Sequence, residues 1–188
     1  MRIQVIRLAL ILGMLAPGIP ASPLSRIYTY GDSLSDPLFT NGPVAVELLA
    51  DRLGLPALSR ANHAVGGATT GVGNLLDGGT VTTPSARGGM TTQLDDTIAG
   101  LNTADALFIV WGGPNDFLTP DPTDVYPFGV AGRAITNLVS IVHRLKNDGA
   151  VHILVPGLPD LGLTPFYRGQ PPPAAQEDAS LSAGFNQR

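Results

Sequence analysis

The sequence contains no cysteine, which excludes disulfide bonds and thiolate metal sites. Charged residues make up only 14% of the 188 residues, and the net charge is −4. Domains that bind nucleic acid carry an excess of basic side chains, so we expect no nucleic-acid partner. Hydrophobic residues are abundant, at 44%, and this is enough for one globular domain with a buried core.

The first 21 residues have the layout of a secretory signal peptide. Arg2 and Arg7 precede an apolar stretch at 8–15, and small or helix-breaking residues follow at 16–21. The apolar stretch is short for a bilayer span, and an N-terminal membrane anchor is the alternative. We therefore expect an exported protein, periplasmic or extracellular, with no stable membrane span after cleavage.

Short apolar runs alternate with segments of helical periodicity after the predicted signal. The runs are β-branched, aromatic or continuously apolar, and they predict strands at 26–30, 60–65, 106–111 and 151–155. The run at 106–111 is continuously apolar, so we expect it to be buried on both faces of a sheet, and we expect 151–155 to be another buried strand.

Apolar side chains at helical spacing predict the helices. The first predicted helix follows the cap Asn41 and stops at Gly54, with Val44, Leu48, Leu49 and Leu53 on its stripe. Further helices are predicted at 90–101, at 128–148 and from Gln176 onward. Strands and helices in alternation predict an α/β fold with a mainly parallel sheet.

Three unusual segments follow three of the predicted strands. GDSLSD occupies 31–36, GGATTG occupies 66–71 within a loop that holds eight glycines between 66 and 89, and GGPND occupies 112–116. Each alone is typical of a turn. Binding sites in open parallel sheets form beyond the carboxyl ends of strands, so their shared position favours a functional site.

These segments resemble the SGNH/GDSL hydrolase family, in particular its secreted lipase and esterase branch. SRIYTYGDSLSD resembles the first block of that family, NHAVGGATTG the second and IVWGGPND the third, with support from NGPVAVELLADRLG and VPGLPDLGLTP. The resemblance covers 25–188. It implies a three-layer α/β/α, flavodoxin-like domain that is incomplete at its C-terminus, with the last strand–helix unit missing.

The resemblance also implies an activity and a set of site residues. It implies a serine ester hydrolase of the lipase, esterase or acylhydrolase type, without a cofactor, acting on a small-molecule or lipid ester through an acyl-enzyme on Ser33. The oxyanion donors would be the backbone N–H groups of Ser33 and Gly67 and the side-chain amide of Asn115. We expect Asp32 and Asp36 to brace the serine turn.

The sequence lacks the motif that supplies the catalytic base in the family. The family carries a late Asp-x-x-His motif, and this chain has none, so no catalytic His or Asp is assigned. His143 and His152 are predicted at the sheet edge opposite Ser33, and His63 takes a packing position. The chain as given is therefore expected to be nearly inactive.

A second departure lies in the loop after the serine block. Only residues 37–40 separate Asp36 from NGPV, where family members often carry a longer loop, so substrate choice can differ. The alternatives are an inactive fragment or binding remnant, and a carbohydrate acetyl esterase. Metal-dependent hydrolysis is disfavoured because no His/Asp cluster has ligand spacing. Dinucleotide binding is disfavoured because Gly66-Gly67 lacks the G-x-G-x-x-G spacing.

The predicted signal peptide makes a testable statement about the mature protein. Cleavage after Ala21 removes Arg2 and Arg7, so the net charge changes from −4 to −6. Intact-mass measurement of the exported protein should give a chain that begins at Ser22. A mass that retains residues 1–21 would support the membrane anchor instead.

Overall fold

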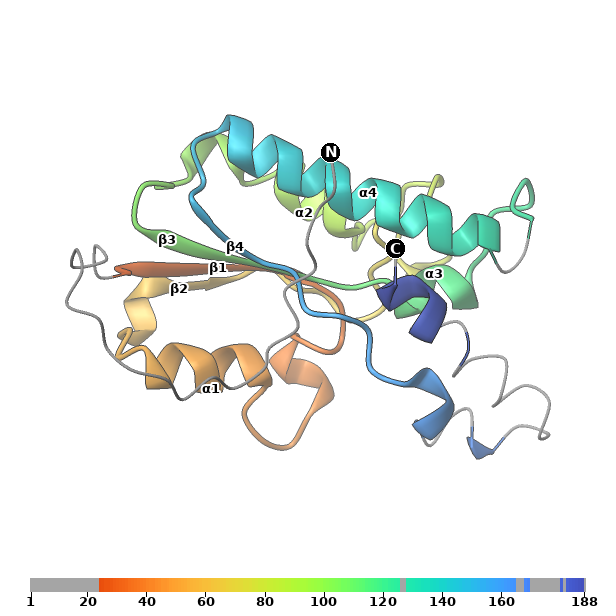
Figure 1. Cartoon of the computed structure of the whole chain (residues 1–188), viewed down its shortest axis with the longest axis horizontal. Helices are drawn as coiled ribbons and strands as arrows, with labels where there is room; N and C mark the ends of the chain where they lie inside the picture. Colours follow the sequence, from red (N-terminus) through yellow and green to blue (C-terminus); the bar gives the residue numbers. More distant parts are fainter. Residues whose placement is uncertain (1–23, 126–127, 165–167, 170–179, 181, 188) are drawn as a thin grey trace.

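A four-stranded parallel sheet forms the centre of the computed structural model (Figure 1). Its strand order is β2-β1-β3-β4, and every neighbouring pair is parallel. The strands are β1 Arg26–Gly31, β2 Arg60–Asn62, β3 Ala106–Trp111 and β4 His152–Leu154. The structure describes residues 24–125, 128–164, 168–169, 180 and 182–187, so the predicted signal peptide at 1–21 lies outside the described residues.

Helices cover both faces of the sheet, which confirms the predicted three-layer α/β fold (Figure 1). Helix α1, Ala45–Arg52, lies on one face, and α2, Met90–Asp95, and α4, Phe128–Asn147, lie on the other. The short α3, Pro114–Leu118, follows β3 directly. Single 3₁₀ turns occupy Pro37–Phe39 (η1), Ala57–Ser59 (η2), Leu75–Asp77 (η3), Ile98–Gly100 (η4) and Leu161–Leu163 (η5).

Side chains of the central strands alternate between two hydrophobic clusters. Tyr28, Tyr30 and Phe108 belong to the cluster under α2 and α4, whereas Ile27 and Ile109 belong to the cluster under α1. Successive residues of a strand point to opposite faces, so each central strand supplies both clusters. This double burial explains why the apolar run at 106–111 is continuous.

The predicted strands 26–30 and 106–111 and the predicted helix 128–148 are confirmed within a residue or so. Helix α2 ends at Asp95, earlier than the predicted Leu101. The Thr97 hydroxyl donates to the carbonyl of Gln93 at 2.8 Å. The Thr97 N–H donates to the carbonyl of Leu94, three residues earlier, rather than to the carbonyl four residues earlier that an α-helix uses. Threonine side chains compete with helical hydrogen bonding in this way, and a 3₁₀ turn follows.

Two sequence predictions about burial are wrong, the second of them in part. The predicted buried strand 151–155 is a three-residue edge strand, with His152 exposed and Ile153 and Leu154 half-buried, because β4 pairs with β3 alone among the described residues. The apolar stripe predicted for α1 is confirmed only in part, because Val44 and Leu49 join the cluster under α1 but Leu48 and Leu53 do not. The helix buries Val46 and Ala50 against the sheet, while Leu48 and Leu53 are 48% and 41% exposed.

The end of the chain is described in part. Of the helix predicted from Gln176, residues 176–179 lie outside the described part, and 180 and 182–186 are helical. Within the described ranges, no helix combines the length and the apolar character that a bilayer span needs.

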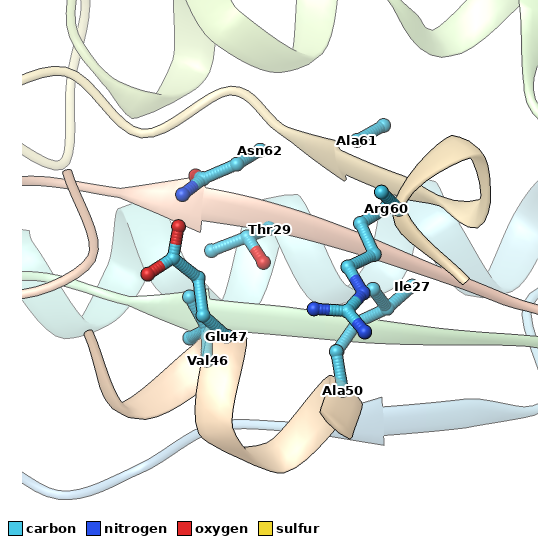
Figure 2. A pocket seen from close by; sticks show the side chains of 9 residues that line it. Ile27, Thr29, Val46, Glu47, Ala50, Arg60, Ala61 and Asn62 are labelled. Carbon is cyan, nitrogen blue, oxygen red and sulfur yellow. The ribbon is translucent and has the colours of Figure 1, made fainter. Parts of the chain in front are cut away.

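A cavity of about 270 Å³ lies between α1 and the β2 edge of the sheet (Figure 2). Its polar lining residues already have structural partners. Glu47 caps α1 by accepting from Val44 N–H at 3.1 Å, Arg60 donates to the Leu55 carbonyl at 2.8 Å, and Asn62 donates to the Ser35 carbonyl at 2.7 Å. We therefore interpret the cavity as a gap in the packing between α1 and the edge strand β2.

Candidate active site

Ser33 lies in a tight turn directly after β1. The carbonyl of Asp32 accepts from the N–H groups of Ser35 and Asp36, both at 3.0 Å, and the Asp32 carboxyl accepts from Leu34 N–H at 2.9 Å. Asp32 is buried, and Ser33 is half-buried. Hydrogen bonds to Asp32 therefore brace the turn, as predicted, and Ser33 lies half-buried within it.

The carboxylate of Asp36 joins the serine turn to the glycine loop. One of its oxygens accepts from Gly66 N–H at 2.8 Å, and the other accepts from Leu38 N–H at 2.9 Å. The prediction that Asp36 braces this region is confirmed. Because Gly66 precedes the predicted oxyanion donor, the bond to Asp36 ties Gly67 to the serine turn.

Gly67 adopts a conformation that favours glycine. Its φ is +82°, in the left-handed region. A Cβ at this position would lie 2.5 Å from the side-chain oxygen of Asn74, so a side chain has no room. Asn74 is fully buried and donates to the Gly66 carbonyl at 3.0 Å while accepting from Leu76 N–H at 2.9 Å. The sequence analysis missed Asn74, although a lone asparagine within the glycine-rich loop was its signal.

Asn115 lies in α3 and is 7% exposed. Its amide nitrogen donates to the carbonyl of Ala68, the residue after Gly67, at 2.9 Å. An amide nitrogen carries two hydrogens, so one N–H remains for a ligand. The structure thus brings the segments of Ser33, Gly67 and Asn115 together at the carboxyl edge, while their catalytic roles stay predictions.

Asp116 adds a second connection between the glycine loop and α3. Its two carboxyl oxygens accept from the N–H and the hydroxyl of Thr70, at 2.9 and 2.6 Å. The amide of Asn137 in α4 donates to the same hydroxyl at 3.0 Å. Asp116 therefore holds the glycine loop on α3.

None of the three histidines lies beside Ser33. His63 stacks on Tyr30, with 5.3 Å between ring centroids, and burial lowers the pKa of its imidazole. His152 pairs in register with Leu107 near the start of β3, at the amino edge of the sheet. His143 lies one turn before the end of α4, next to the connection into the start of β4. The predicted positions of all three are confirmed.

Gln93 is a site-supporting residue that the sequence analysis did not identify. It is buried in α2, and its amide pairs with both backbone groups of Gly31: it accepts from the N–H at 3.0 Å and donates to the carbonyl at 2.9 Å. Gly31 is the last residue of β1, two positions before Ser33. The sequence could have indicated Gln93, because it is a polar residue on the same helical face as the apolar Met90 and Leu94.

Two buried carboxyl groups lie under the site. Burial is the main cause that raises the pKa of Asp32 to about 7; the Leu34 hydrogen bond opposes this shift, and the nearby charge of Asp116 adds to it. One oxygen of Asp32 has no hydrogen-bond partner among the described residues. Burial also raises the pKa of Asp116 to about 6, although its bonds from Thr70 oppose the shift. The described residues contain no group of three His, Cys, Asp or Glu placed to hold a metal ion.

Comparisons with known proteins agree with this arrangement. Residues 27–188 match the family described as GDSL-like Lipase/Acylhydrolase. An uncharacterized protein in the trpE-trpG intergenic region of Pseudomonas putida is 34% identical over 88% of this chain and 33% of its own length. The phosphatidylcholine-sterol acyltransferase of Aeromonas hydrophila is 28% identical over 94% of this chain and 58% of its own length. The chain thus spans a third to somewhat over half of these curated relatives.

The chain has a weaker structural similarity to a solved carbohydrate esterase. The active site of that esterase is described as displaying divergent catalytic and non-catalytic binding functions. The esterase is 14% identical, with a TM-score of 0.41, and the likeness covers 72% of this chain and 48% of that one.

The buried carboxyl of Asp32 should make stability depend on pH. The unfolded chain loses this proton near pH 4 and the folded protein keeps it to about pH 7, so the free energy of unfolding should fall as pH rises between these values. Asp32→Asn keeps the acceptor for Leu34 N–H without a charge. Between pH 4 and 8, the free energy of unfolding measured in urea should fall less in this variant than in the wild type, by on the order of 2–4 kcal/mol. Asp96→Asn, at an exposed position, should keep the wild-type slope. A wild-type slope in Asp32→Asn would contradict the raised pKa.

The pairing of Gln93 with Gly31 should be a large contribution to stability. Gln93→Leu leaves the buried N–H of Gly31 without its partner, whereas the Gly31 carbonyl still accepts from Val65 N–H at 3.1 Å, so the free energy of unfolding should fall by about 1–3 kcal/mol. The same change at exposed Gln187 should stay within about 0.5 kcal/mol in the same denaturant titration. Equal stability of the two variants would show that Gly31 does not need the amide.

Proposed function

The chain belongs to the GDSL-like lipase/acylhydrolase family, and from that premise we propose that it is an exported serine ester hydrolase with Ser33 as its nucleophile. The observation that carries the proposal is the hydrogen-bonded junction of three loops at one sheet edge. Asp36 binds the glycine loop to the serine turn, and Asn115 binds the same loop to α3. Export rests on the charged, apolar and small-residue layout of residues 1–21.

The proposed reaction is acyl transfer to water in two steps. The Ser33 hydroxyl attacks the ester carbonyl carbon as a base removes its proton, and the carbonyl oxygen takes the negative charge. The tetrahedral intermediate then expels the alcohol, which receives the proton, and leaves an acyl group on Ser33. Water repeats the attack and releases the carboxylic acid, which restores the serine.

The oxyanion needs donors that are held in place before the reaction. Gly67 is supported in this role because its left-handed backbone is packed against Asn74, which fixes the direction of its N–H. Asn115 is supported because its bond to Ala68 orients the amide and leaves one hydrogen unused. The backbone N–H of Ser33 completes the proposed set.

The reaction also requires a base, and the three histidines of the sequence lie elsewhere. We therefore propose none of the three as the base. Residues 1–188 alone should then be nearly inactive. The positions of the three histidines also favour a second candidate, a binding remnant that keeps the oxyanion site without turnover.

The substrate is proposed to be a carboxylic ester. The A. hydrophila relative is named as a phosphatidylcholine-sterol acyltransferase, and this name supports acyl ester chemistry. The net charge of −4 disfavours a strongly acidic substrate.

The test is hydrolysis of p-nitrophenyl butyrate by the exported protein purified from its complete native gene. Ser33→Ala should lower turnover by about 10⁴-fold or more, because the nucleophile is lost. Ser59→Ala, a half-buried serine before β2 at the opposite edge, should leave turnover within about twofold.

Three results would change the proposal. Equal turnover of wild type and Ser33→Ala would exclude Ser33 as the nucleophile. Absence of Ser33-dependent turnover in the native protein would favour the binding remnant. Ser33-dependent turnover by residues 1–188 alone would show that the base lies within them.

A further inference from the structure

The carboxyl edge of the sheet exposes apolar side chains directly beside the proposed oxyanion site. Phe39 and Leu76 are each 51% exposed, although both sit in short 3₁₀ turns rather than in free loops. Exposed apolar surface next to a polar site is typical of a ligand-binding surface. Neither Phe39 nor Leu76 belongs to the two hydrophobic core clusters.

Both side chains lie against the glycine pair that contains the oxyanion donor. A Cβ built on Gly66 would lie 1.8 Å from the ring of Phe39, and one built on Gly67 would lie 2.6 Å from Cγ of Leu76. The two apolar groups therefore occupy the space that side chains at 66 and 67 would fill. An ester carbonyl that accepts from Gly67 N–H must come within about 3 Å of that nitrogen, so its substituents pass beside Phe39 and Leu76.

The carboxylate of Asp36 holds the Phe39 turn and the glycine pair together. It accepts from Leu38 N–H on one oxygen and from Gly66 N–H on the other, and Phe39 N–H donates to the Asp36 carbonyl at 3.2 Å. Pro37 begins the turn and limits its backbone freedom. The ring of Phe39 is thus preorganised beside Gly66, and little conformational entropy is lost when a ligand packs on it.

Leu76 is held by a second set of bonds. Its N–H donates to the side-chain oxygen of Asn74 at 2.9 Å, and Leu75 N–H donates to the Gly67 carbonyl at 2.8 Å. The turn that carries Leu76 is therefore fastened to Gly67 itself. The short loop at 37–40 and the turn at 75–77 together place one apolar side chain on each of two consecutive glycines.

We propose that Phe39 and Leu76 bind the acyl chain of the ester and make the protein select fatty acyl esters over acetyl esters. The proposal rests on the proposed function, because it takes Gly67 as an oxyanion donor. The acyl chain stays bound through both steps of the reaction, whereas the alcohol must leave with a proton. Permanent apolar contact therefore suits the acyl half.

The test measures binding of the product carboxylates, which needs no catalytic base. Butyrate, hexanoate and octanoate are titrated into the native protein, and NMR follows the amide signals of Gly67 and Asn115 and the ring signals of Phe39. Each fully buried methylene strengthens binding by about fourfold, so octanoate should bind at least about tenfold more tightly than butyrate. The Phe39 ring signals should shift with octanoate.

Variants separate the acyl contacts from the oxyanion contacts. Phe39→Ala and Leu76→Ala should each weaken octanoate binding by about fivefold to tenfold and leave butyrate binding within about twofold. Phe39→Leu keeps an apolar contact and should recover most of the loss. Leu58→Ala is the matched control, because Leu58 is 99% exposed in η2, which precedes β2 at the opposite edge.

The outcomes distinguish the two proposals. If the carboxylates shift Gly67 and Asn115 but bind with equal affinity at every chain length, the acyl assignment is wrong and the oxyanion assignment stands. The acyl assignment is also wrong if octanoate binds Phe39→Ala and Leu76→Ala as tightly as wild type. If no carboxylate shifts Gly67 or Asn115, the oxyanion site of the proposed function is wrong, and the acyl assignment fails with it.

Discussion

Loops at the carboxyl edge of a parallel sheet carry backbone N–H and carbonyl groups that no strand pairs. Buried groups of this kind must find other partners, because an unpaired one costs on the order of 1–3 kcal/mol. Here short polar side chains supply them: Asp36 for Gly66, Asn74 for Gly66 and Leu76, Asn115 for Ala68, and Gln93 for Gly31. The same bonds that satisfy the loops also orient the proposed oxyanion donors, so the geometry of the site follows from backbone satisfaction.

This arrangement places two carboxyl groups in a poorly solvated region. Asp116 is compensated by two bonds from Thr70, whereas one oxygen of Asp32 is left without a partner among the described residues. The raised pKa values of both groups express that cost. Sites are commonly less stable than the scaffold that holds them, and the serine turn over Asp32 fits that pattern.

Predictions from the sequence succeeded where the signal was local and periodic. The β-branched and aromatic residues of β1 predicted a strand, the continuous apolar run of β3 predicted a strand buried on both faces, and the apolar positions of α4 predicted a long helix. They failed where burial depends on neighbours that are distant in sequence. The run at 151–155 has the composition of a central strand, but its place in the strand order puts it at an edge. Helix α1 buries Val46 and Ala50 because its orientation on the sheet, which no local pattern encodes, turns Leu48 outward.

By itself, the sequence determined the alternating α/β plan, and its resemblance to a known family singled out Ser33, Gly67 and Asn115. Turns and strands depend mostly on residues that are close in sequence, so the sequence alone can indicate them. The tertiary structure alone decided what holds those residues and what surrounds them. Gln93 meets Gly31 across 62 positions, Asp36 meets Gly66 across 30, and Phe39 packs on Gly66. Such contacts depend on which strands are adjacent and where each loop leaves the sheet, and the order of residues along the chain does not state either.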